Sequence, residues 1–264
     1  MKIGLSIIIV VKNSKDDLSK TLHSIRANNT ELLKAKTETV IIDGLSRDGS
    51  WELSTRAERI TGIKTHCYQQ PPQGIYPAMN LGQHKSSGNW LVYINAGDTF
   101  HDCKNLGDIL QQSTSNAIQF KSAIKRPNSR HAYTKIQYWD RCHQALIYRK
   151  GNHQVLGGYN EDLKICSDSL FIMRLEKSDV EYVDQILSIT QVSPNNASRN
   201  PRLVREDLEA INRFEIDHHP WAKPWLTLTI LRVEAALGSS MSVWILCHLG
   251  RLFSKYQKID VRDQ

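Results

Sequence analysis

Three polar stretches of the sequence carry the side chains best suited to chemistry. The first is Val40-Ile41-Ile42-Asp43-Gly44-Leu45-Ser46-Arg47-Asp48-Gly49-Ser50, in which a carboxylate directly follows a hydrophobic run. A carboxylate at a strand end can accept hydrogen bonds from a nucleobase or a ribose, whereas Ser46 and Asp48 are residue types that cap helices and close turns. The residues alone leave both interpretations open, a ligand site or a turn with a helix cap.

The other two stretches also join carboxylates to hydrophobic segments. Asn95-Ala96-Gly97-Asp98 follows the apolar run Trp90 to Ile94, and Asp168 opens an amphipathic pattern that continues to Leu175. Asp98 can be explained as a turn residue. Asp168 can be explained as an acid in the first turn of a helix, where it is favourable by a few tenths to about 1 kcal/mol. These carboxylates are therefore candidates for binding or catalysis that the residue pattern does not decide.

The hydrophobic pattern predicts the elements that must position these stretches. Apolar runs indicate buried strands, and apolar stripes at helical spacing indicate the helices between them. The predicted strands are Leu5–Val11, Glu38–Asp43, Ile63–Tyr68 and Trp90–Ile94, and the predicted helices follow Ser14 and span Ser50–Ile60 and Ile75–His84. Successive strand and helix units imply right-handed crossovers and a parallel sheet.

An open α/β sheet of this kind binds ligands in the crevice beyond the carboxyl ends of its strands. The polar residues that follow the predicted strands should therefore converge on one crevice. They are Asn13, Asp43, Ser46, Asp48, Asn95 and Asp98.

The remainder of the chain is less regular. Strands are predicted over Ala117–Ile124 and Gln144–Tyr148, a helix over Ser167–Lys177, and helical patterns dominate from Pro201 onward. We predict one α/β domain over residues 1–200 and a helical C-terminal extension over residues 201–264.

Composition excludes several classes of protein. The 264 residues carry a formal net charge of +7, which favours anionic partners. The sequence has no helix-turn-helix, zinc-finger or RNP pattern, which argues against a nucleic-acid-binding protein. It also has no Walker loop and no GxGxxG motif, which argues against a P-loop NTPase and a dinucleotide oxidoreductase. The five cysteines are odd in number and widely spaced, so we expect no disulfide framework and a reducing compartment.

The N-terminal apolar run Leu5–Val11 is interpreted as a buried strand and not as a signal peptide.

Taken together, the motifs resemble those of glycosyltransferase family two, whose members are inverting enzymes with the GT-A fold. The resemblance is carried by the strand Leu5–Val11, the pair Lys12-Asn13 and the stretch Val40 to Ser50. Gln73-Gly74-Ile75-Tyr76-Pro77-Ala78-Met79-Asn80-Leu81-Gly82 and Tyr93 to Asp98 are similar to the colanic-acid and exopolysaccharide branch of that family. The resemblance covers residues 3 to about 190.

This resemblance implies a role for each candidate residue. Asp168 would be the catalytic base, and Asp98 would bind Mg²⁺ or Mn²⁺ on the donor's diphosphate, although Asn95 and Gly97 stand where many relatives carry aspartates. The expected contacts of the nucleotide sugar are Asn13, Asp43, Ser46, Asp48, Gly74, Asn80 and Asn95. The expected contacts of the acceptor or the phosphates are His143, Gln144 and Asp162.

The implied reaction transfers a hexose or deoxyhexose from a nucleoside diphosphate sugar to a glycan or a polyprenyl-diphosphate-linked acceptor in surface polysaccharide biosynthesis. One alternative is a nucleotidyltransferase, but Lys12-Asn13-Ser14-Lys15 lacks the glycines of its phosphate loop. Another is a non-catalytic nucleotide-sugar-binding or scaffold protein, which the residues Asn95 and Gly97 keep open.

The C-terminal extension bears on the cellular location. Its longest uncharged stretch, Ala235 to Leu249, is shorter than the roughly 20 residues of a membrane-spanning helix. Arg251, Lys255 and Lys258 could instead meet anionic lipid from an interfacial helix, or the helices could pack on the domain or form a dimer. We expect a cytoplasmic protein with peripheral contact to the inner face of the cell membrane.

Overall fold

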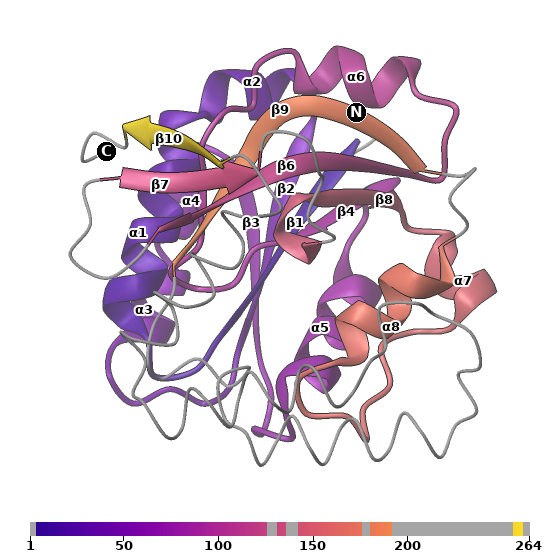
Figure 1. Ribbon diagram of the computed structural model, residues 1–264. Helices are drawn as coiled ribbons and strands as arrows, with labels where there is room; N and C mark the ends of the chain where they lie inside the picture. The colour runs from indigo at the N-terminus through magenta and orange to yellow at the C-terminus, as the bar shows by residue number, and fades with distance from the viewer. Residues whose placement is uncertain (1–3, 126–130, 136–141, 176–179, 192–255, 261–264) are drawn as a thin grey trace, which may run out of the picture.

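The three-dimensional structure is a computed structural model of the chain that describes residues 4–125, 131–135, 142–175, 180–191 and 256–260. Figure 1 shows one strongly twisted sheet with helices on both of its faces. The predicted α/β class is confirmed, and the elements divide into a parallel part and a mixed part.

The parallel part of the sheet is formed by the first four strands. They are β1 (Leu5–Val11), β2 (Thr37–Asp43), β3 (Lys64–Gln69) and β4 (Trp90–Tyr93), in the spatial order β3-β2-β1-β4. Each neighbouring pair of these strands is parallel. In the pair β1–β2, the register runs from Leu5 opposite Thr37 to Val11 opposite Asp43. The carboxyl ends of these strands therefore lie at one edge of the sheet, as the sequence predicts.

The mixed part of the sheet extends from β4. The strands β8 (Leu146–Arg149), β6 (Ala117–Lys125), β7 (His131–Lys135) and β10 (Tyr256–Asp260) follow in that order, each antiparallel to its neighbour. The long strand β9 (Val180–Gln191) pairs in parallel with β6 and antiparallel with the short β5 (Thr99–Phe100). Strand β9 thereby brings residue 191 close to the turn that follows β4.

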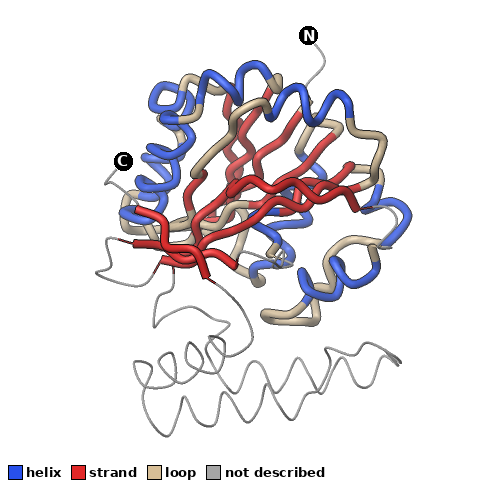
Figure 2. The backbone as a smooth tube through the Cα atoms, turned by 45° about the horizontal axis from the view of Figure 1, so that its top comes forward, coloured by secondary structure: helices blue, strands red, loops and turns tan. Residues whose placement is uncertain are grey.

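Helices cover both faces of the sheet (Figure 2). One core contains residues of β1 such as Ile7 and Ile9, packed against α1 (Lys15–Ala27), α2 (Asn29–Lys34), α3 (Ser50–Ser54), α4 (Ala57–Thr61) and α6 (Leu106–Gln112). The other core contains Ile8, packed against α5 (Ile75–Lys85), α7 (Asn152–Leu156) and α8 (Ser167–Arg174). Side chains of a strand alternate between its faces, so a continuous apolar run such as Leu5–Val11 supplies both cores.

Several predicted elements differ from the observed ones. The predicted helix Ser50–Ile60 is two short helices, because at Arg56 the amide bonds to the carbonyl three residues back, Leu53. The predicted strand Gln144–Tyr148 begins only at Leu146, since His143–Ala145 form the 3-10 turn η1. The helix that begins at Ser167 ends at Arg174, where Leu175 takes an extended conformation.

The predicted C-terminal helices fall on residues 192–255, which lie outside the described residues. The prediction of a helical C-terminal extension is wrong for Tyr256–Asp260. These residues form strand β10, which continues the sheet beyond β7. Ile259 packs against a small core of Ala123, Ala132 and Ile189. Within the described ranges, no helix has the length and hydropathy needed to cross a bilayer.

Candidate active site

Two loops at the carboxyl ends of β1 and β2 are tied together by the predicted nucleotide-binding residues. The Asn13 amide donates to Ser46 Oγ at 2.8 Å, and Asn13 Oδ1 accepts from the Arg47 amide at 2.9 Å. Asp48 Oδ2 accepts from the Lys15 amide at 2.9 Å, and its Oδ1 accepts from the Ser50 amide and hydroxyl. The structure therefore brings Asn13, Ser46 and Asp48 together and gives their side chains a loop-fixing role.

Asp43 combines a turn role with an unused oxygen. It is completely buried at the end of β2. Its Oδ1 accepts from the Ser46 amide at 2.9 Å and from Gln69 Nε2 at 3.2 Å. Its Oδ2 has no hydrogen-bond partner among the described residues. Since a buried oxygen without a partner is costly, Asp43 Oδ2 is the atom of this loop that most needs a ligand donor.

Asn95 to Asp98 form a tight turn at the end of β4. The Asp98 amide donates to the Asn95 carbonyl at 3.0 Å, and Gly97 has φ +102°, a conformation that side chains rarely adopt. Thr21 of α1 holds the turn, because its hydroxyl donates to the Asp98 carbonyl at 2.8 Å and accepts from the Gly97 amide at 3.0 Å. The first long helix thus fixes the position of Asp98.

The Asp98 carboxylate is buried and held at both oxygens. Gln144 Nε2 donates to Oδ2 at 2.8 Å, and the Gln191 amide donates to Oδ1 at 3.0 Å. The residue is only 5% exposed. Burial raises the pKa of Asp98 to about 6, against the opposing effect of these two hydrogen bonds.

The residues around Asp98 fit a divalent cation with few protein ligands. The side-chain oxygen of Asn95 is buried and has no hydrogen-bond partner within the described residues. Together Asn95 Oδ1 and Asp98 offer oxygen ligands, and Mg²⁺ commonly takes one or two carboxylates and completes its coordination with phosphates and water. Over the described ranges, no group of three His, Cys, Asp or Glu residues could hold a metal by itself. A cation here would therefore depend on a phosphate-bearing ligand.

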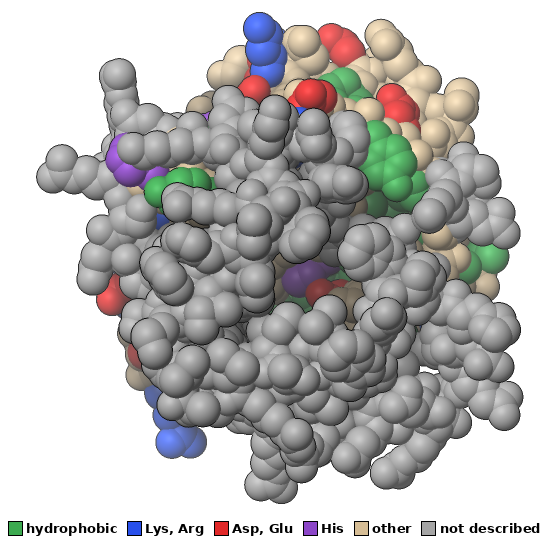
Figure 3. Space-filling model, in the orientation of Figure 1, with side chains coloured by type: hydrophobic (Ala, Val, Ile, Leu, Met, Phe, Trp, Pro, Cys, Tyr) green, Lys and Arg blue, Asp and Glu red, His purple; other side chains and the backbone are tan. Residues whose placement is uncertain are grey.

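Asp168, in the first turn of α8, is the second carboxylate of the site. Its Oδ1 accepts from the Tyr76 hydroxyl at 2.9 Å, and its Oδ2 lies 2.6 Å from His143 Nδ1. The side chains of His143 and Asp168 are 14% and 16% exposed. In the space-filling view, histidine and acidic atoms lie together in a hollow of the face seen in Figure 1 (Figure 3).

The two groups of this pair reinforce each other's charge. Burial by itself would raise the pKa of Asp168, but the combined effect of His143 and of the hydrogen bonds from Tyr76 and the Ser169 amide outweighs it, and the pKa is lowered. Burial would likewise lower the pKa of His143, but the combined effect of the Asp168 and Asp98 carboxylates outweighs it, and the pKa is raised. His143 Nδ1 donates to Asp168 Oδ2 and, in that tautomer, His143 Nε2 can accept from Asn95 Nδ2. The pair is largely buried, and each partner favours the ionised form of the other.

The turn η1 connects the two carboxylates. Its first two residues, His143 and Gln144, contact Asp168 and Asp98, respectively. The Nε2 atom of His143 also lies 3.2 Å from Asn95 Nδ2. The sequence predicted His143 and Gln144 as contacts of the acceptor or the phosphates. Their side chains link the Asn95–Asp98 turn to helix α8, and the contacts with acceptor or phosphates stay a prediction.

The remaining predicted residues lie around the loop that precedes α8. Asn80 Nδ2 donates to the Tyr159 carbonyl at 2.9 Å and to Glu161 Oε1 at 2.8 Å, while its Oδ1 accepts from the Tyr159 amide at 2.9 Å. Asn80 therefore positions this loop. Asp162 is exposed on the same loop, and Gly74, with φ +137°, precedes the first residue of α5.

Sequence reasoning missed Tyr76 and Gln191 as members of the site. Tyr76 lies within the motif Gln73 to Gly82, but nothing in its spacing indicated a bond to Asp168. Gln191 acts through its backbone amide, which any residue type other than proline supplies, so no sequence signal could have identified it.

Comparison with solved structures supports the GT-A fold. Staphylococcus aureus TarS 1-349 in complex with UDP-GlcNAc superposes with a TM-score of 0.62 at 14% identity, covering 88% of this chain and 71% of that one. The mannosyltransferase PcManGT from Pyrobaculum calidifontis, in complex with GDP-Man and Mn²⁺, has a TM-score of 0.61 at 15% identity, covering 96% of this chain and 81% of that one.

Sequence comparison identifies curated relatives and the family. A PGL/p-HBAD biosynthesis glycosyltransferase of Mycobacterium bovis (strain BCG / Pasteur 1173P2) is 25% identical over 158 residues, which are 52% of this chain and 57% of the relative. The chain thus matches a little over half the length of that relative. The family model described as glycosyl transferase family 2 matches residues 6–178, which contain the crevice, η1 and the start of α8. The chain therefore belongs to glycosyl transferase family 2.

Proposed function

We propose that this protein transfers a sugar from a nucleoside diphosphate sugar to a hydroxyl group of a glycan or lipid-linked acceptor, with inversion at the anomeric carbon. The observation that carries the proposal is the polar network in which η1 holds two carboxylates, Asp98 and Asp168, beside one crevice. The solved relatives that bind UDP-GlcNAc or GDP-Man support a nucleotide sugar as the donor.

The donor would bind across the loops that follow β1, β2 and β4. The free oxygen of Asp43 would accept a hydrogen bond from the base or the ribose, and the loops tied by Asn13, Ser46 and Asp48 would frame the nucleotide. Asn95 and Asp98 would hold Mg²⁺ or Mn²⁺. When bound, such an ion neutralises the negative charge that develops on the leaving diphosphate.

The acceptor would bind beside Asp168. Each carboxylate oxygen of Asp168 accepts one hydrogen bond in the structure, and each retains a second lone pair for an acceptor hydroxyl. The lowered pKa of Asp168 keeps its carboxylate ionised at neutral pH, so it is ready to accept a proton. As the hydroxyl attacks the anomeric carbon its acidity rises, and the proton then passes to Asp168.

The finer assignment rests on the sequence motifs. We propose that the transferred unit is a hexose or deoxyhexose and that the product belongs to a surface polysaccharide of the exopolysaccharide or colanic-acid type. We also propose that the protein acts at the cytoplasmic face of the cell membrane, where polyprenyl-diphosphate-linked acceptors are elongated.

The first test is binding. The melting temperature of the purified protein is measured with UDP, GDP, dTDP and CMP, each with and without Mn²⁺, since a ligand of the folded state raises it. We expect one diphosphate to raise the melting temperature in a Mn²⁺-dependent manner, and we expect Asp98→Ala to abolish the effect. The absence of a shift with every nucleotide would overturn the proposal.

The second test separates catalysis from binding. With the nucleotide sugar identified by the first test, Asp168→Asn should reduce turnover by about a thousandfold or more while donor affinity stays within about twofold. Comparable losses in turnover and donor affinity would contradict the role of Asp168 as base. Donor binding without any turnover by the unmodified protein, over a panel of acceptors, would instead favour a non-catalytic nucleotide-sugar-binding protein.

A further inference from the structure

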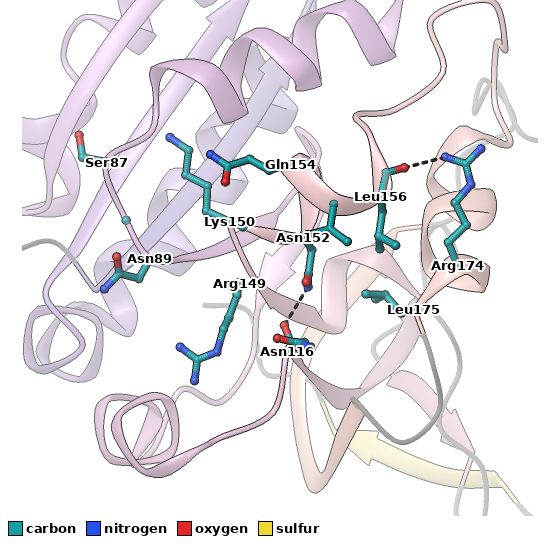
Figure 4. Close-up of a pocket in the computed structure, with 13 residues that line it drawn as sticks. Ser87, Asn89, Asn116, Arg149, Lys150, Asn152, Gln154, Leu156, Arg174 and Leu175 are labelled. Atoms are coloured by element: carbon teal, nitrogen blue, oxygen red, sulfur yellow. Dashed lines mark hydrogen bonds between the residues drawn. The ribbon is translucent and has the colours of Figure 1, made fainter.

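A second concave site lies at the other end of β4 from the crevice. It is a cavity of about 740 Å³ between the residues that precede β4, the end of β8, and helices α7 and α8 (Figure 4). Residues 87–89 directly precede Trp90, the first residue of β4, whereas the crevice turn follows the last residue of that strand. The cavity is therefore separate from the proposed donor and acceptor sites.

The lining of this cavity is basic and rich in amides. It includes Arg149, Lys150 and Arg174, and none of its 13 lining residues is Asp or Glu. The remaining polar side chains are those of Ser87, Asn89, Asn116, Asn152 and Gln154. A concave surface with charge of one sign concentrates ligands of the opposite charge.

The acidic residue whose charge acts on Lys150 is Glu38, and it is already used elsewhere. Glu38 raises the pKa of Lys150 against the larger effect of burial, which lowers it. Glu38 Oε1, however, accepts hydrogen bonds from the Ser6 hydroxyl and the Ser87 amide, and Glu38 is 1% exposed. Glu38 therefore lies behind the cavity wall and cannot serve as a counter-ion inside the cavity.

Within the described part of the chain, the three cations are anchored by backbone carbonyls and not by carboxylates. Lys150 Nζ donates to the Ser86 carbonyl, and Arg174 Nη1 donates to the Leu156 carbonyl at 3.1 Å. An ammonium group has three N–H donors and a guanidinium group has five, so both side chains keep donors for a ligand. Arg149 is more fully used, because it bonds to the carbonyls of residues 113 and 115 and stacks on Trp90.

Figure 4 shows how these groups are arranged. The ends of Lys150 and Gln154 lie next to each other in this view, and Arg174 rises from α8 on the other side. The Arg149 guanidinium extends away from both, in agreement with its structural contacts. Lys150, Gln154 and Arg174 are therefore the residues with donors to offer.

We propose that this cavity is a binding site for a phosphate or diphosphate group, contacted by Lys150, Gln154 and Arg174. Cationic N–H donors form their strongest hydrogen bonds with phosphate and carboxylate oxygens. The cavity is larger than a diphosphate, so it leaves room for the group that carries it. Exposed Val155 and half-buried Leu156 give part of the wall an apolar character.

The test is a calorimetric titration of the protein with inorganic pyrophosphate. EDTA is present so that no divalent cation contributes to binding. The double variant Lys150→Gln/Arg174→Gln should bind pyrophosphate at least tenfold more weakly than the unmodified protein. The control Arg59→Gln/Lys104→Gln removes two exposed charges elsewhere and should change the affinity less than twofold. Equal affinities of the two double variants would overturn the proposal. Arg149 is left intact because its loss would disturb the fold.

Two further arms identify the source of the phosphate and the independence of the site. If a lipid carries the group, vesicles of phosphatidylglycerol compete with pyrophosphate and vesicles of phosphatidylcholine do not; if it is a soluble ligand, neither competes. Binding of the nucleotide sugar with Mn²⁺ should be unchanged in Lys150→Gln/Arg174→Gln. A parallel loss of both affinities would show that the cavity and the crevice are not independent, and would overturn the second site while leaving the proposed transferase activity intact.

Discussion

The Tyr76 hydroxyl and the His143 imidazole together hold both oxygens of Asp168, and each favours the ionised carboxylate. Tyr76→Phe removes one of these hydrogen bonds and leaves the ring in place. We therefore expect the pKa of Asp168 to rise, so that the acid limb of the kcat profile moves to higher pH by about half to one unit. Donor KM should stay nearly constant, because the hydroxyl that is removed bonds to the proposed base while the ring keeps its packing.

A matched control for this variant lies in the same aromatic cluster. Tyr159→Phe removes a buried hydroxyl that bonds to Tyr148 at 3.1 Å, whereas the hydrogen bonds to the Asp168 oxygens come from Tyr76 and His143. It should lower the melting temperature without moving the pH profile. Equal displacement of the profile in both variants would mean that Tyr76 acts through packing and not through Asp168.

Asp98 should make metal-dependent donor binding depend on pH, because its pKa is raised by burial, whereas that of Asp168 is lowered by its partners. Burial raises its pKa to about 6, and a metal ligand must be ionised to bind. Below pH 6 the folded protein holds a proton on Asp98, so at pH 5 the Mn²⁺-dependent affinity for a nucleotide sugar should be about tenfold weaker than at pH 7.5. Calorimetry at the two pH values measures this change. A nucleotide sugar is preferable to a free diphosphate, whose terminal phosphate titrates in the same range.

The control is the variant Asp98→Asn, which has no proton to lose at this position. It should bind weakly and with little dependence on pH between 5 and 7.5. A pH dependence as steep as that of the unmodified protein would assign the titration to another group.

At the scale of elements, the turn between β4 and β5 depends on the backbone of Gly97. With φ +102°, a residue with a side chain is strained there, although the nearest atom to an added Cβ would be at an ordinary 3.4 Å. Gly97→Ala should therefore cost about 1–2 kcal/mol of unfolding free energy through the backbone alone, measured by urea denaturation. Because Asp98 adjoins the strained residue, Mn²⁺-dependent donor binding should weaken as well.

Gly151→Ala is the corresponding control. This residue has φ −57°, and nothing lies within 4 Å of an added Cβ. We expect it to be neutral or slightly stabilising, since alanine restricts the unfolded chain. If both glycine variants lost the same stability, backbone conformation at Gly97 would not be the cause.

The elements that the sequence predicted well are those with strong local patterns. Leu5–Val11 and Trp90–Tyr93 are continuous apolar runs buried on both faces, so the parallel half of the sheet and its crevice followed directly. The turn η1 did not, because His143-Gln144-Ala145 adjoin an apolar run and are as compatible with a strand as with a turn. Their conformation is fixed by long-range bonds to Asp98 and Asp168, which no local pattern contains.

The same limit applied to the candidate residues. Asp43, Asp98 and Asp168 were recognisable because they lie in motifs that resemble those of the family, whereas their positions at element ends alone also fit turn and helix-cap residues. The loop-fixing roles of Asn13, Asp48 and Asn80 depend on which backbone groups come near them, and that became visible only with the fold.

At the scale of the whole molecule, the described C-terminal strand changes how membrane attachment has to be tested. Of the three residues proposed from the sequence to meet anionic lipid, Arg251 and Lys255 lie outside the described residues, and Lys258 lies in strand β10 and not in a helix. Removing everything after Pro220 would also remove β10, which pairs with β7 and buries part of Ile259 beside Ala132. A truncated protein could lose vesicle binding simply because its sheet is damaged.

Charge substitutions avoid that ambiguity. If Arg251 and Lys255 meet an anionic membrane, each contributes about 1 kcal/mol, so Arg251→Gln/Lys255→Gln should weaken flotation with phosphatidylglycerol vesicles by roughly thirtyfold. The control Lys20→Gln/Lys34→Gln removes two exposed charges from α1 and α2, each of which has a carboxylate partner, and should have a much smaller effect. The net charge of +7 falls equally in both variants. Equal weakening would therefore assign membrane binding to overall charge, and a full-length protein that does not float would exclude the membrane contact altogether.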